Sequence, residues 1–343
     1  MNVYILTFHS AHNYGAVFQA FALQYYLKSI CNNGIVACID YKPAFITYHL
    51  LHNRNGENVI KWCFHNLLVL PSRMKRKNGF EQFIKKNINT IAIDSAMKSK
   101  EAVLIAGSDQ IWNKDITGGA LDDMYFFLSF ASHKRYSYAA SIGSNKTERI
   151  IEITKKIESF ISIGVREKDI ADTMFNLGLS NTYHNIDPVF LVEKSKYYQI
   201  SVRPKLSNYI FIYTLETSIE EVKRKIAIAK QLYPHSKIVS LGSFRNIYQS
   251  DIHLNTATPE EYLGLIQNAT AVITNSFHVT AFCIIFNIPM AYVPLKNGRE
   301  GRILSLLSLV KYYKDFDEYS RIELNELINE SEMYLKNIIK NAS

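Results

Sequence analysis

Short apolar runs alternate with amphipathic segments along most of this chain. The apolar runs have the length of buried strands, and the segments that follow carry apolar residues every three or four positions, as helices that cover a sheet do. Strands are expected at residues 2–8, 35–41, 102–106, 135–141, 162–165, 209–213, 237–240, 271–274 and 290–293, and helices at 15–28, 147–160, 219–232, 259–267, 277–286, 301–310 and 317–341, with a less regular helical stretch across 44–100. This alternation predicts an α/β fold built on parallel sheets.

The length of 343 residues exceeds one ordinary core and is enough for two domains. A polar stretch near 192–207, in which Arg203 is followed by Pro204, marks the expected boundary. We therefore predict two Rossmann-like domains that face one cleft, a GT-B-like architecture, at residues 1–195 and 205–343. The dinucleotide fingerprint GxGxxG is missing from the opening strand–helix–strand unit, so NAD is not predicted.

The net charge narrows the range of partners. It is formally +8, and the sequence pI is about 9.0. A basic surface favours phosphorylated substrates, anionic lipid headgroups or nucleic acid. Nucleic acid is the weakest of the three, because no zinc knuckle or RRM-like aromatic motif accompanies the basic residues, and we expect no nucleic-acid partner.

The cysteines, the first residues and the length of the apolar runs together indicate the cellular compartment of the protein. The four cysteines are far apart and form no CxxC motif, so free thiols in a reducing environment are expected. The first residues, MNVYILTFHS, lack the pattern of a signal peptide. No apolar stretch reaches the roughly 18–20 residues that span a bilayer. We expect a cytoplasmic protein.

One stretch, AVITNSFHVTAFCIIF at residues 271–286, predicts a buried strand, a turn with helix-capping residues and an apolar helix. His278 then lies in the first turn of a helix after the carboxyl end of a strand, where open α/β sheets bind ligands and helix N-termini attract anions. An imidazole there is a candidate general acid. On spacing alone, a histidine that packs in the core or caps the helix is the more common case.

Two further strand ends carry polar residues. The loop GSDQIWN at residues 107–113 follows a buried strand and reads either as a site loop or as a turn stapled by Asp109 and anchored by Trp112. Arg166 stands at a strand end and helix start, as His278 does; the alternative for it is a surface ion pair with Glu167 or Asp169.

The stretch 61–86 combines apolar and basic residues and predicts a helix on a membrane surface. The more common alternative is a helical hairpin with a solvated basic turn. The apolar set is Trp62, Phe64, Leu67, Leu68 and Leu70, and the basic set is Arg73, Lys75, Arg76, Lys77, Lys85 and Lys86.

Eight motifs in the right order resemble the polysaccharide pyruvyl transferase family, over about residues 3–310. They are HSAHNYGAVFQAFALQYYL (9–27), IDYKP (39–43), IAGSDQIWN (105–113), YSYAASIG (136–143), GVREKD (164–169), IDPVFL (186–191), ITNSFHVTAFCIIF (273–286) and GRILSLL (301–307). The resemblance implies a GT-B-like fold and transfer of pyruvate from phosphoenolpyruvate to a sugar, which yields a cyclic ketal and phosphate. It also implies that His278 is the catalytic histidine and that Arg166 binds phosphoenolpyruvate.

The sequence departs from the family at two positions near this histidine. Many members have Gly where this chain has Val279, and some carry an arginine where it has Ser276. Ser276 at the helix N-terminus is then expected to offer donors to phosphoenolpyruvate, while Arg302 and Lys296 are the candidates for the missing cation.

The acceptor sugar is assigned to the N-terminal domain and the donor to the C-terminal domain. No cofactor is expected, since phosphoenolpyruvate is a co-substrate, and no HxxxH or paired-carboxylate spacing argues for a metal. The expected acceptor-side residues are His12, Asn13, Tyr14, Asp109, Gln110 and Asp187, although the proline after Asp187 favours a turn role for it.

The resemblance also implies a place in capsule or exopolysaccharide biosynthesis. The acceptor is then a sugar diol, with a galactose-type sugar as one candidate, and the sequence leaves open whether it is carried on a polyprenyl diphosphate or on a nucleotide. A lipid-linked acceptor would place the protein at the inner face of an anionic membrane. The competing interpretations are a GT-B glycosyltransferase that uses a nucleotide sugar, with Glu300 as its ribose ligand, and a non-catalytic glycan-binding module.

Overall fold

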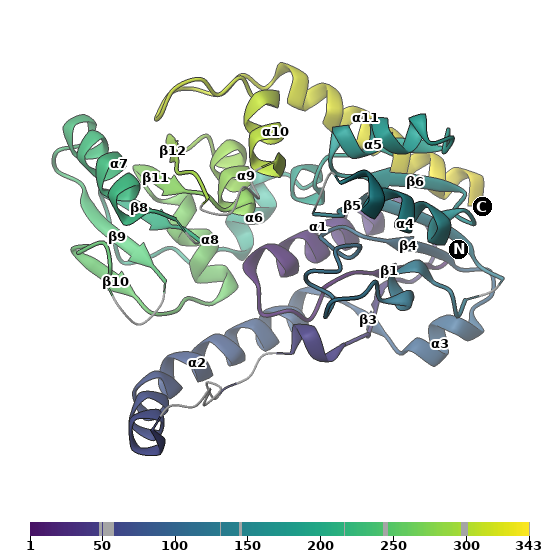
Figure 1. Ribbon diagram of the computed structural model, residues 1–343, viewed down its shortest axis with the longest axis horizontal. Helices are drawn as coiled ribbons and strands as arrows, with labels where there is room; N and C mark the ends of the chain where they lie inside the picture. Colours follow the sequence, from purple (N-terminus) through teal and green to yellow (C-terminus); the bar gives the residue numbers. More distant parts are fainter. Residues whose placement is uncertain are drawn as a thin grey trace. The chain divides into compact units, whose positions relative to one another are not determined.

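The computed structural model describes residues 1–47, 50, 58–130, 132–143, 146–215, 217–242, 246–295 and 301–342. The chain divides into two compact units, each built on one parallel sheet (Figure 1). The first unit consists of Met1–Thr47, Ile84–Glu193 and Arg321–Ser343, and the second of Tyr48–Phe83 and Lys194–Ser320.

The sheet of the first unit has the strand order β3-β2-β1-β4-β5-β6-β7, with every pair parallel. Its central strands are buried on both faces because helices cover both sides, as the continuous apolar runs predicted. From β1 the chain adds β2 and β3 on one side of that strand, and it then adds β4 on the other side. The strand order therefore reverses between β1 and β4. The strands are β1 (Val3–Leu6), β2 (Val36–Ile39), β3 (Thr90–Ile91), β4 (Val103–Ala106), β5 (Lys134–Ala140), β6 (Ser162–Val165) and β7 (Thr182–His184).

The helices of the first unit include α1, which is buried nearly all round because it packs against η3 and α11 as well as β2. The aromatic part of the core centres on Trp112, whose ring stacks on Phe126 at 5.7 Å. The helices are α1 (Tyr14–Ile30), η1 (Ala44–Ile46), α3 (Ile93–Lys98), η2 (Asp123–Phe126), α4 (Thr147–Ile157), α5 (Lys168–Asn176), η3 (Pro188–Leu191) and α11 (Ile322–Ala342).

The sheet of the second unit has the order β10-β9-β8-β11-β12 and is also parallel throughout, with its reversal between β8 and β11. The apolar helix α9 is buried along its whole length. The strands are β8 (Tyr209–Tyr213), β9 (Lys237–Leu241), β10 (Ile252–Leu254), β11 (Ala271–Thr274) and β12 (Met290–Tyr292). The helices are α2 (Val59–Asn87), whose residues 84–87 are counted in the first unit, α6 (Lys194–Ile200), α7 (Ile219–Leu232), α8 (Pro259–Gln267), α9 (Phe277–Phe286) and α10 (Gly301–Leu309).

The strongest patterns in the sequence predicted their elements to the residue. Residues 162–165, 209–213, 219–232, 259–267, 271–274 and 277–286 coincide with β6, β8, α7, α8, β11 and α9. The edge strands β3, β7 and β10 and the helix α6 were not predicted; α3 lies in the stretch 44–100 that was expected to be helical, whereas β3 interrupts it. The elements that were not predicted are too short for a hydrophobic period to be recognised in the sequence. An edge segment also becomes a strand only through hydrogen bonds to the neighbouring strand.

The observed units differ in two places from the predicted ranges 1–195 and 205–343. Residues 321–343 belong to the first unit, because α11 packs there: the Tyr334 hydroxyl donates to the Ser137 carbonyl at 2.7 Å, and the Ser331 hydroxyl accepts from the Ile186 amide at 2.9 Å. Residues 48–83 belong to the second unit, where Lys75 pairs with Glu261 at 2.8 Å. The change of unit near residue 193 lies close to the predicted boundary.

Removing the Tyr334 hydroxyl tests this assignment of α11. Tyr334→Phe leaves the buried Ser137 carbonyl without that donor, which costs about 1–3 kcal/mol in free energy of unfolding. Urea unfolding followed by circular dichroism measures the loss. Met333→Ala changes the exposed neighbour and should shift the midpoint much less; equal effects of the two variants would mean that α11 is not docked through Tyr334.

Candidate functional site

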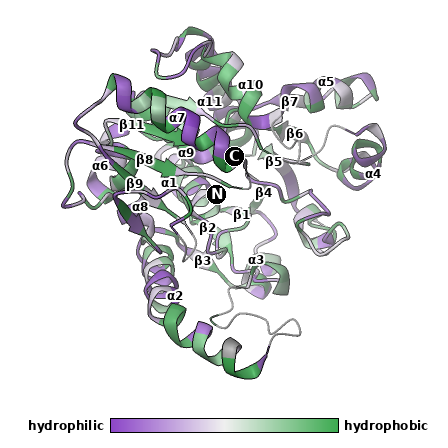
Figure 2. Ribbon diagram, turned by 60° about the vertical axis from the view of Figure 1, so that its left-hand side comes forward, coloured by the Kyte–Doolittle hydropathy of each residue, from purple (hydrophilic) through white to green (hydrophobic). Residues whose placement is uncertain are grey.

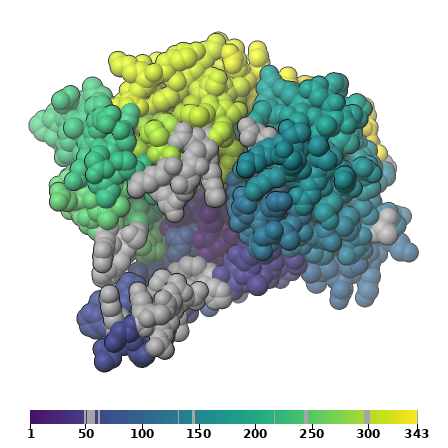
Figure 3. Space-filling model, in the orientation of Figure 1, coloured from purple at the N-terminus to yellow at the C-terminus, as the bar shows by residue number. Residues whose placement is uncertain are grey.

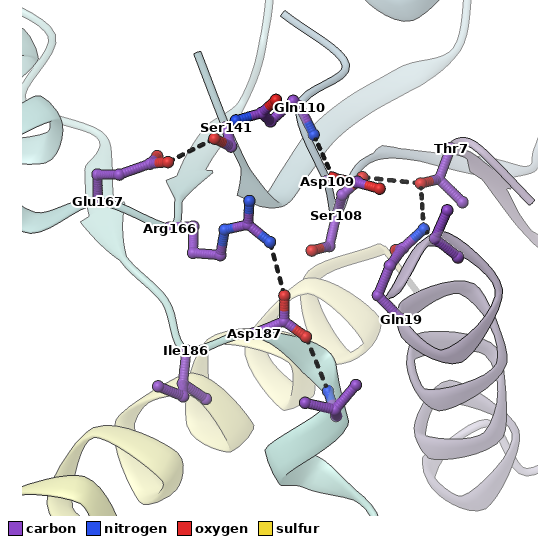
Figure 4. A network of polar contacts seen from close by, with 12 residues as sticks. Thr7, Gln19, Ser108, Asp109, Gln110, Ser141, Arg166, Glu167, Ile186 and Asp187 are labelled. Atoms are coloured by element: carbon purple, nitrogen blue, oxygen red, sulfur yellow. Dashed lines mark hydrogen bonds and ion pairs between the residues drawn. The ribbon is translucent and has the colours of Figure 1, made fainter. Parts of the chain in front are cut away.

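Polar side chains meet in the first unit where its strand order reverses. The Thr7 hydroxyl, just past β1, donates to the Ser108 carbonyl, just past β4, at 2.7 Å, and Gln19 on α1 donates to the Thr7 hydroxyl at 2.9 Å (Figure 4). The Ser108 hydroxyl and the Gln19 side-chain oxygen are buried and have no hydrogen-bond partner among the described residues. Ligands of open α/β sheets bind at such a reversal, so this edge is a candidate site.

The loop at residues 107–113 is held against β5. Gly107 has φ +118°, and a Cβ there would lie 2.3 Å from the Tyr138 carbonyl oxygen, so only glycine fits. Asp109 has φ 76°, its carboxylate accepts from the Gln110 amide at 2.8 Å, and its carbonyl accepts from the Ser141 amide at 2.9 Å. The stapled turn predicted as one alternative is therefore present, and it places Asp109 at the carboxyl edge of the sheet.

The side chain of Gln110 is held by Asn113, three residues further along the loop. Its side-chain oxygen accepts from the Asn113 amide group at 3.3 Å, and both side chains are buried. Gly143, with φ +68°, lies against this pair, since a Cβ there would be 2.3 Å from Asn113 Nδ2 and 3.0 Å from Gln110 Nε2.

Arg166 follows β6 and forms a buried ion pair. Its Nη1 donates to Asp187 Oδ2 at 2.7 Å, and the two side chains are 3% and 0% exposed. Burial alone would lower the pKa of Arg166, but the charges of Asp187, Glu167 and Asp109 outweigh it and raise that pKa. The predicted alternative of a surface ion pair with Glu167 or Asp169 is wrong: the pair is buried and its partner is Asp187, which β7 brings beside the end of β6.

Asp187 and Glu167 have structural partners as well. Asp187 Oδ1 accepts from the Val189 amide at 3.1 Å and caps η3, which is the predicted turn role. The Ser141 hydroxyl donates to Glu167 Oε1. Glu167 was not predicted as a site residue. Its position directly after Arg166 in GVREKD was the available signal.

The charges of this network are unbalanced, with three carboxylates around one guanidinium (Figure 4). Carboxylates accept hydrogen bonds from sugar hydroxyls, whereas an anionic ligand would have to share Arg166 with Asp187. The charge of the network is therefore negative, which disfavours a further anion at this edge.

The three predicted residues at the start of α1 differ in environment. Asn13 is exposed, and its side-chain oxygen caps α1 by accepting from the Ala16 amide at 3.3 Å. Tyr14 is buried and His12 is half-buried. All three follow the loop after β1, on the same edge as Thr7.

The second unit has a corresponding arrangement around His278. The Thr274 hydroxyl, at the end of β11, donates to the Tyr213 carbonyl at the end of β8 at 2.7 Å, and Asn275 Oδ1 accepts from the Leu215 amide at 2.7 Å. His278 lies in the first turn of α9, largely buried, with its ring edge-on to Phe277 at 5.2 Å. The predicted histidine therefore stands at the strand reversal of this sheet.

The two residues predicted to cap α9, Asn275 and Ser276, do not cap it through their side chains in the described part of the chain. Ser276 occupies the N-cap position, but its side chain makes no capping hydrogen bond within the described part of the chain. The side-chain oxygen of Asn275 accepts instead from the Leu215 amide, two residues past β8, and its Nδ2 is buried with no partner among the described residues, as is the Thr280 hydroxyl. Val279, which departs from the family pattern, is fully buried.

The remaining predicted residues are in or near α10. Arg302 is half-buried in its first turn. Lys296 and Glu300 lie outside the described residues. Within the residues that the structure describes, no three His, Cys, Asp or Glu side chains gather closely enough to hold a metal ion, and whether the reaction needs one stays a prediction.

The structure thus joins four predicted residues in the first unit, Asp109, Gln110, Arg166 and Asp187, which come from three different strand ends. His278 and Ser276 lie together in the second unit. The first group lies along the carboxyl edge of its sheet, from the strand reversal at β4 across to β7, and the second lies at the strand reversal of its own sheet. Edges of this kind are where α/β enzymes bind their substrates.

Fold and site together define an α/β protein with two Rossmann-like units and a polar centre in each. A model of the polysaccharide pyruvyl transferase family matches residues 13–297, so this chain belongs to that family. None of the curated proteins compared with the chain matches it. Membership of this family supports the assignment of the protein as a transferase in polysaccharide biosynthesis.

Solved structures show the fold. A Listeria monocytogenes protein described as a candidate UDP-N-acetylglucosamine 2-epimerase matches with a TM-score of 0.53 at 10% sequence identity, covering 98% of this chain and 90% of that one. The UDP-GlcNAc 2-epimerase of Neisseria meningitidis matches with a TM-score of 0.48 at 9% identity, covering 100% and 99% of the two chains. The first likeness confirms the predicted GT-B-like fold class; the arrangement of the two domains around a cleft stays a prediction.

Substitution of Gly143 tests whether the loop at residues 107–113 is held as described. Gly143→Ala places a methyl group against Asn113 and also strains a positive φ, so we expect a loss of about 2–4 kcal/mol in free energy of unfolding. Gly119→Ala is the matched control, because Gly119 also has a positive φ, of +93°, but no atom within 4 Å of the added Cβ. Thermal unfolding of both variants gives the comparison, and a larger loss at Gly119 would contradict this packing.

Proposed function

We propose that this protein transfers the pyruvyl group of phosphoenolpyruvate to two hydroxyls of one sugar, which forms a pyruvate ketal and releases phosphate. The observation that carries the proposal is the position of His278, in a chain of this family, in the first turn of α9 at the strand reversal of the second unit. The proposed setting is the assembly of a capsule or exopolysaccharide at the cytoplasmic side of the membrane.

The donor is assigned to the second unit. Phosphoenolpyruvate carries a phosphate and a carboxylate, and the first turn of α9 offers backbone N–H groups and the positive end of the helix dipole. Ser276 stands at the N-cap position of this turn. Arg302 and Lys296 stay candidates for the cation that would complete donor binding.

His278 is assigned as the general acid. Its imidazolium gives a proton to the methylene carbon of the donor, and C2 gains oxocarbenium character. A first sugar hydroxyl attacks C2, and phosphate leaves. The second hydroxyl then closes the ring. Of the two hydroxyl protons released, one restores His278 and the other leaves with phosphate or solvent, so the step balances without a redox partner.

The acceptor is assigned to the first unit. Asp109, Glu167 and Asp187 supply carboxylate oxygens, and Gln110 supplies an amide, as a diol requires for orientation and for loss of a proton. Arg166 as a donor ligand stays a prediction, and its ion pair with Asp187 offers a second role for it, in which it holds η3 and the carboxylates in place.

A GT-B glycosyltransferase is the second candidate, because the solved structure with the same fold carries the name of a nucleotide-sugar enzyme. The two reactions differ in what leaves. Pyruvyl transfer releases phosphate from phosphoenolpyruvate, a glycosyltransferase releases a nucleotide, and a non-catalytic glycan-binding module releases nothing.

Replacement of His278 tests the proposed function. His278→Gln removes the titratable group, so kcat for phosphate release from phosphoenolpyruvate in the presence of a galactoside acceptor should fall by about 100- to 10,000-fold. His235→Gln, an exposed histidine in the same unit, should retain full turnover. Near wild-type turnover of a folded His278→Gln protein would remove His278 as the acid.

Replacement of Arg166 separates its two roles. If it binds the donor, Arg166→Lys should raise KM for phosphoenolpyruvate by about 30- to 1,000-fold, because a charge-assisted pair of about 2–4 kcal/mol loses its forked geometry. If it holds Asp187 instead, Asp187→Asn should change the acceptor KM in the same way as Arg166→Lys, and neither variant should change the donor KM. Initial rates with each substrate varied in turn distinguish the two roles.

A further inference from the structure

The first half of α2 exposes an apolar stripe. The side chains of Ile60, Phe64 and Leu67 are 80%, 63% and 69% exposed, and Leu68 and Met74 are about half exposed. These positions follow one another at helical spacing, so they lie on one face of the helix. Figure 2 shows the hydrophobic colour over these turns, and Figure 3 shows α2 reaching the surface.

Contacts at Val69 and farther along α2 hold the helix to the second unit. Val69 and Phe80 are buried, and a Cβ on Gly79 would lie 2.6 Å from a side-chain carbon of Thr258 at the start of α8. Lys75 reaches Glu261 on α8 at 2.8 Å. The stripe residues Ile60, Phe64 and Leu67 stay exposed beside these contacts, whereas an ordinary surface helix buries its apolar residues and exposes polar ones.

The same helix carries cations at both ends of its apolar part, one before it and four after it. Between Asn58 and Phe80 the sequence contains no Asp or Glu and five cations, Lys61, Arg73, Lys75, Arg76 and Lys77. Two of these have carboxylate partners at the surface, Lys75 with Glu261 and Lys77 with Glu81. Surface pairs of this kind bind weakly and leave the local potential positive.

We propose that this stripe docks on an anionic lipid bilayer, with α2 lying in the plane of the interface. An apolar face next to cations and without acidic residues is complementary to acyl chains beneath anionic headgroups. A second copy of the chain fits less well, because a symmetric contact would place two basic helices together. Crossing the bilayer is not the mode of binding, since no helix in the described ranges combines the length and apolar character that a span needs.

Vesicle sedimentation tests this proposal, and it needs no enzymatic turnover, so its outcome is independent of the proposed function. At low salt the full chain should pellet with vesicles of equal parts phosphatidylglycerol and phosphatidylcholine, and much less with phosphatidylcholine alone. The bound fraction should fall as salt rises.

The stripe variant is Phe64→Glu with Leu67→Glu. Both side chains are exposed, so the fold should tolerate the change, while binding to the anionic vesicles should fall at least about tenfold with the loss of two inserting side chains. The matched control, Leu232→Glu with Met333→Glu, alters two other exposed apolar side chains and should bind as wild type does. Lys75→Gln with Lys77→Gln should weaken binding and flatten its salt dependence.

Three results would overturn the proposal. The wild-type protein could stay in the supernatant at low salt, or the stripe variant could pellet as well as the wild type. The third is a dimer in the absence of lipid, seen by analytical ultracentrifugation and dissolved by the Phe64→Glu and Leu67→Glu pair, which would assign the stripe to a second copy of the chain.

Discussion

At the strand reversal of each sheet, a backbone carbonyl group at or just beyond a strand end needs a hydrogen-bond donor. In both units a threonine hydroxyl is that donor. Thr7 donates to the Ser108 carbonyl between β1 and β4, and Thr274 donates to the Tyr213 carbonyl between β8 and β11. Buried carbonyl groups without partners are costly, so these two bonds fix how the loops leave the strands. Asp109 and His278 lie in the segments that follow directly from these strand ends.

The Arg166–Asp187 ion pair is the second constraint on the first unit. It joins the end of β6 to the turn after β7, out of water, and it keeps a guanidinium among three carboxylates. A buried ion pair of this kind adds little to the free energy of folding, but it strongly favours one geometry. The reason is that separating the partners, or losing one of them, leaves an uncompensated buried charge. The geometry that it selects presents acceptor oxygens, which is why we place the sugar in the first unit and the anionic donor at the N-terminus of α9.

How far the sequence predicts this structure depends on how local each feature is. The strand, turn and helix around His278 lie within one stretch of apolar and capping residues, so β11 and α9 could be read from it. The ion pair could not, because Arg166 and Asp187 meet only through the pairing of β6 with β7. The placement of α2 and α11 in units other than their neighbours in sequence also depends on distant contacts, such as that of Tyr334 with Ser137.

The most direct test of the central claim is the mass and isotope content of the sugar product formed in D₂O. Incubation of the protein with phosphoenolpyruvate and a galactoside should yield an acceptor with one added pyruvate ketal, and its methyl group should carry one deuteron taken from solvent through His278. An unchanged acceptor mass across a panel of sugar diols, or a product that appears only when a nucleotide sugar is supplied, would contradict it.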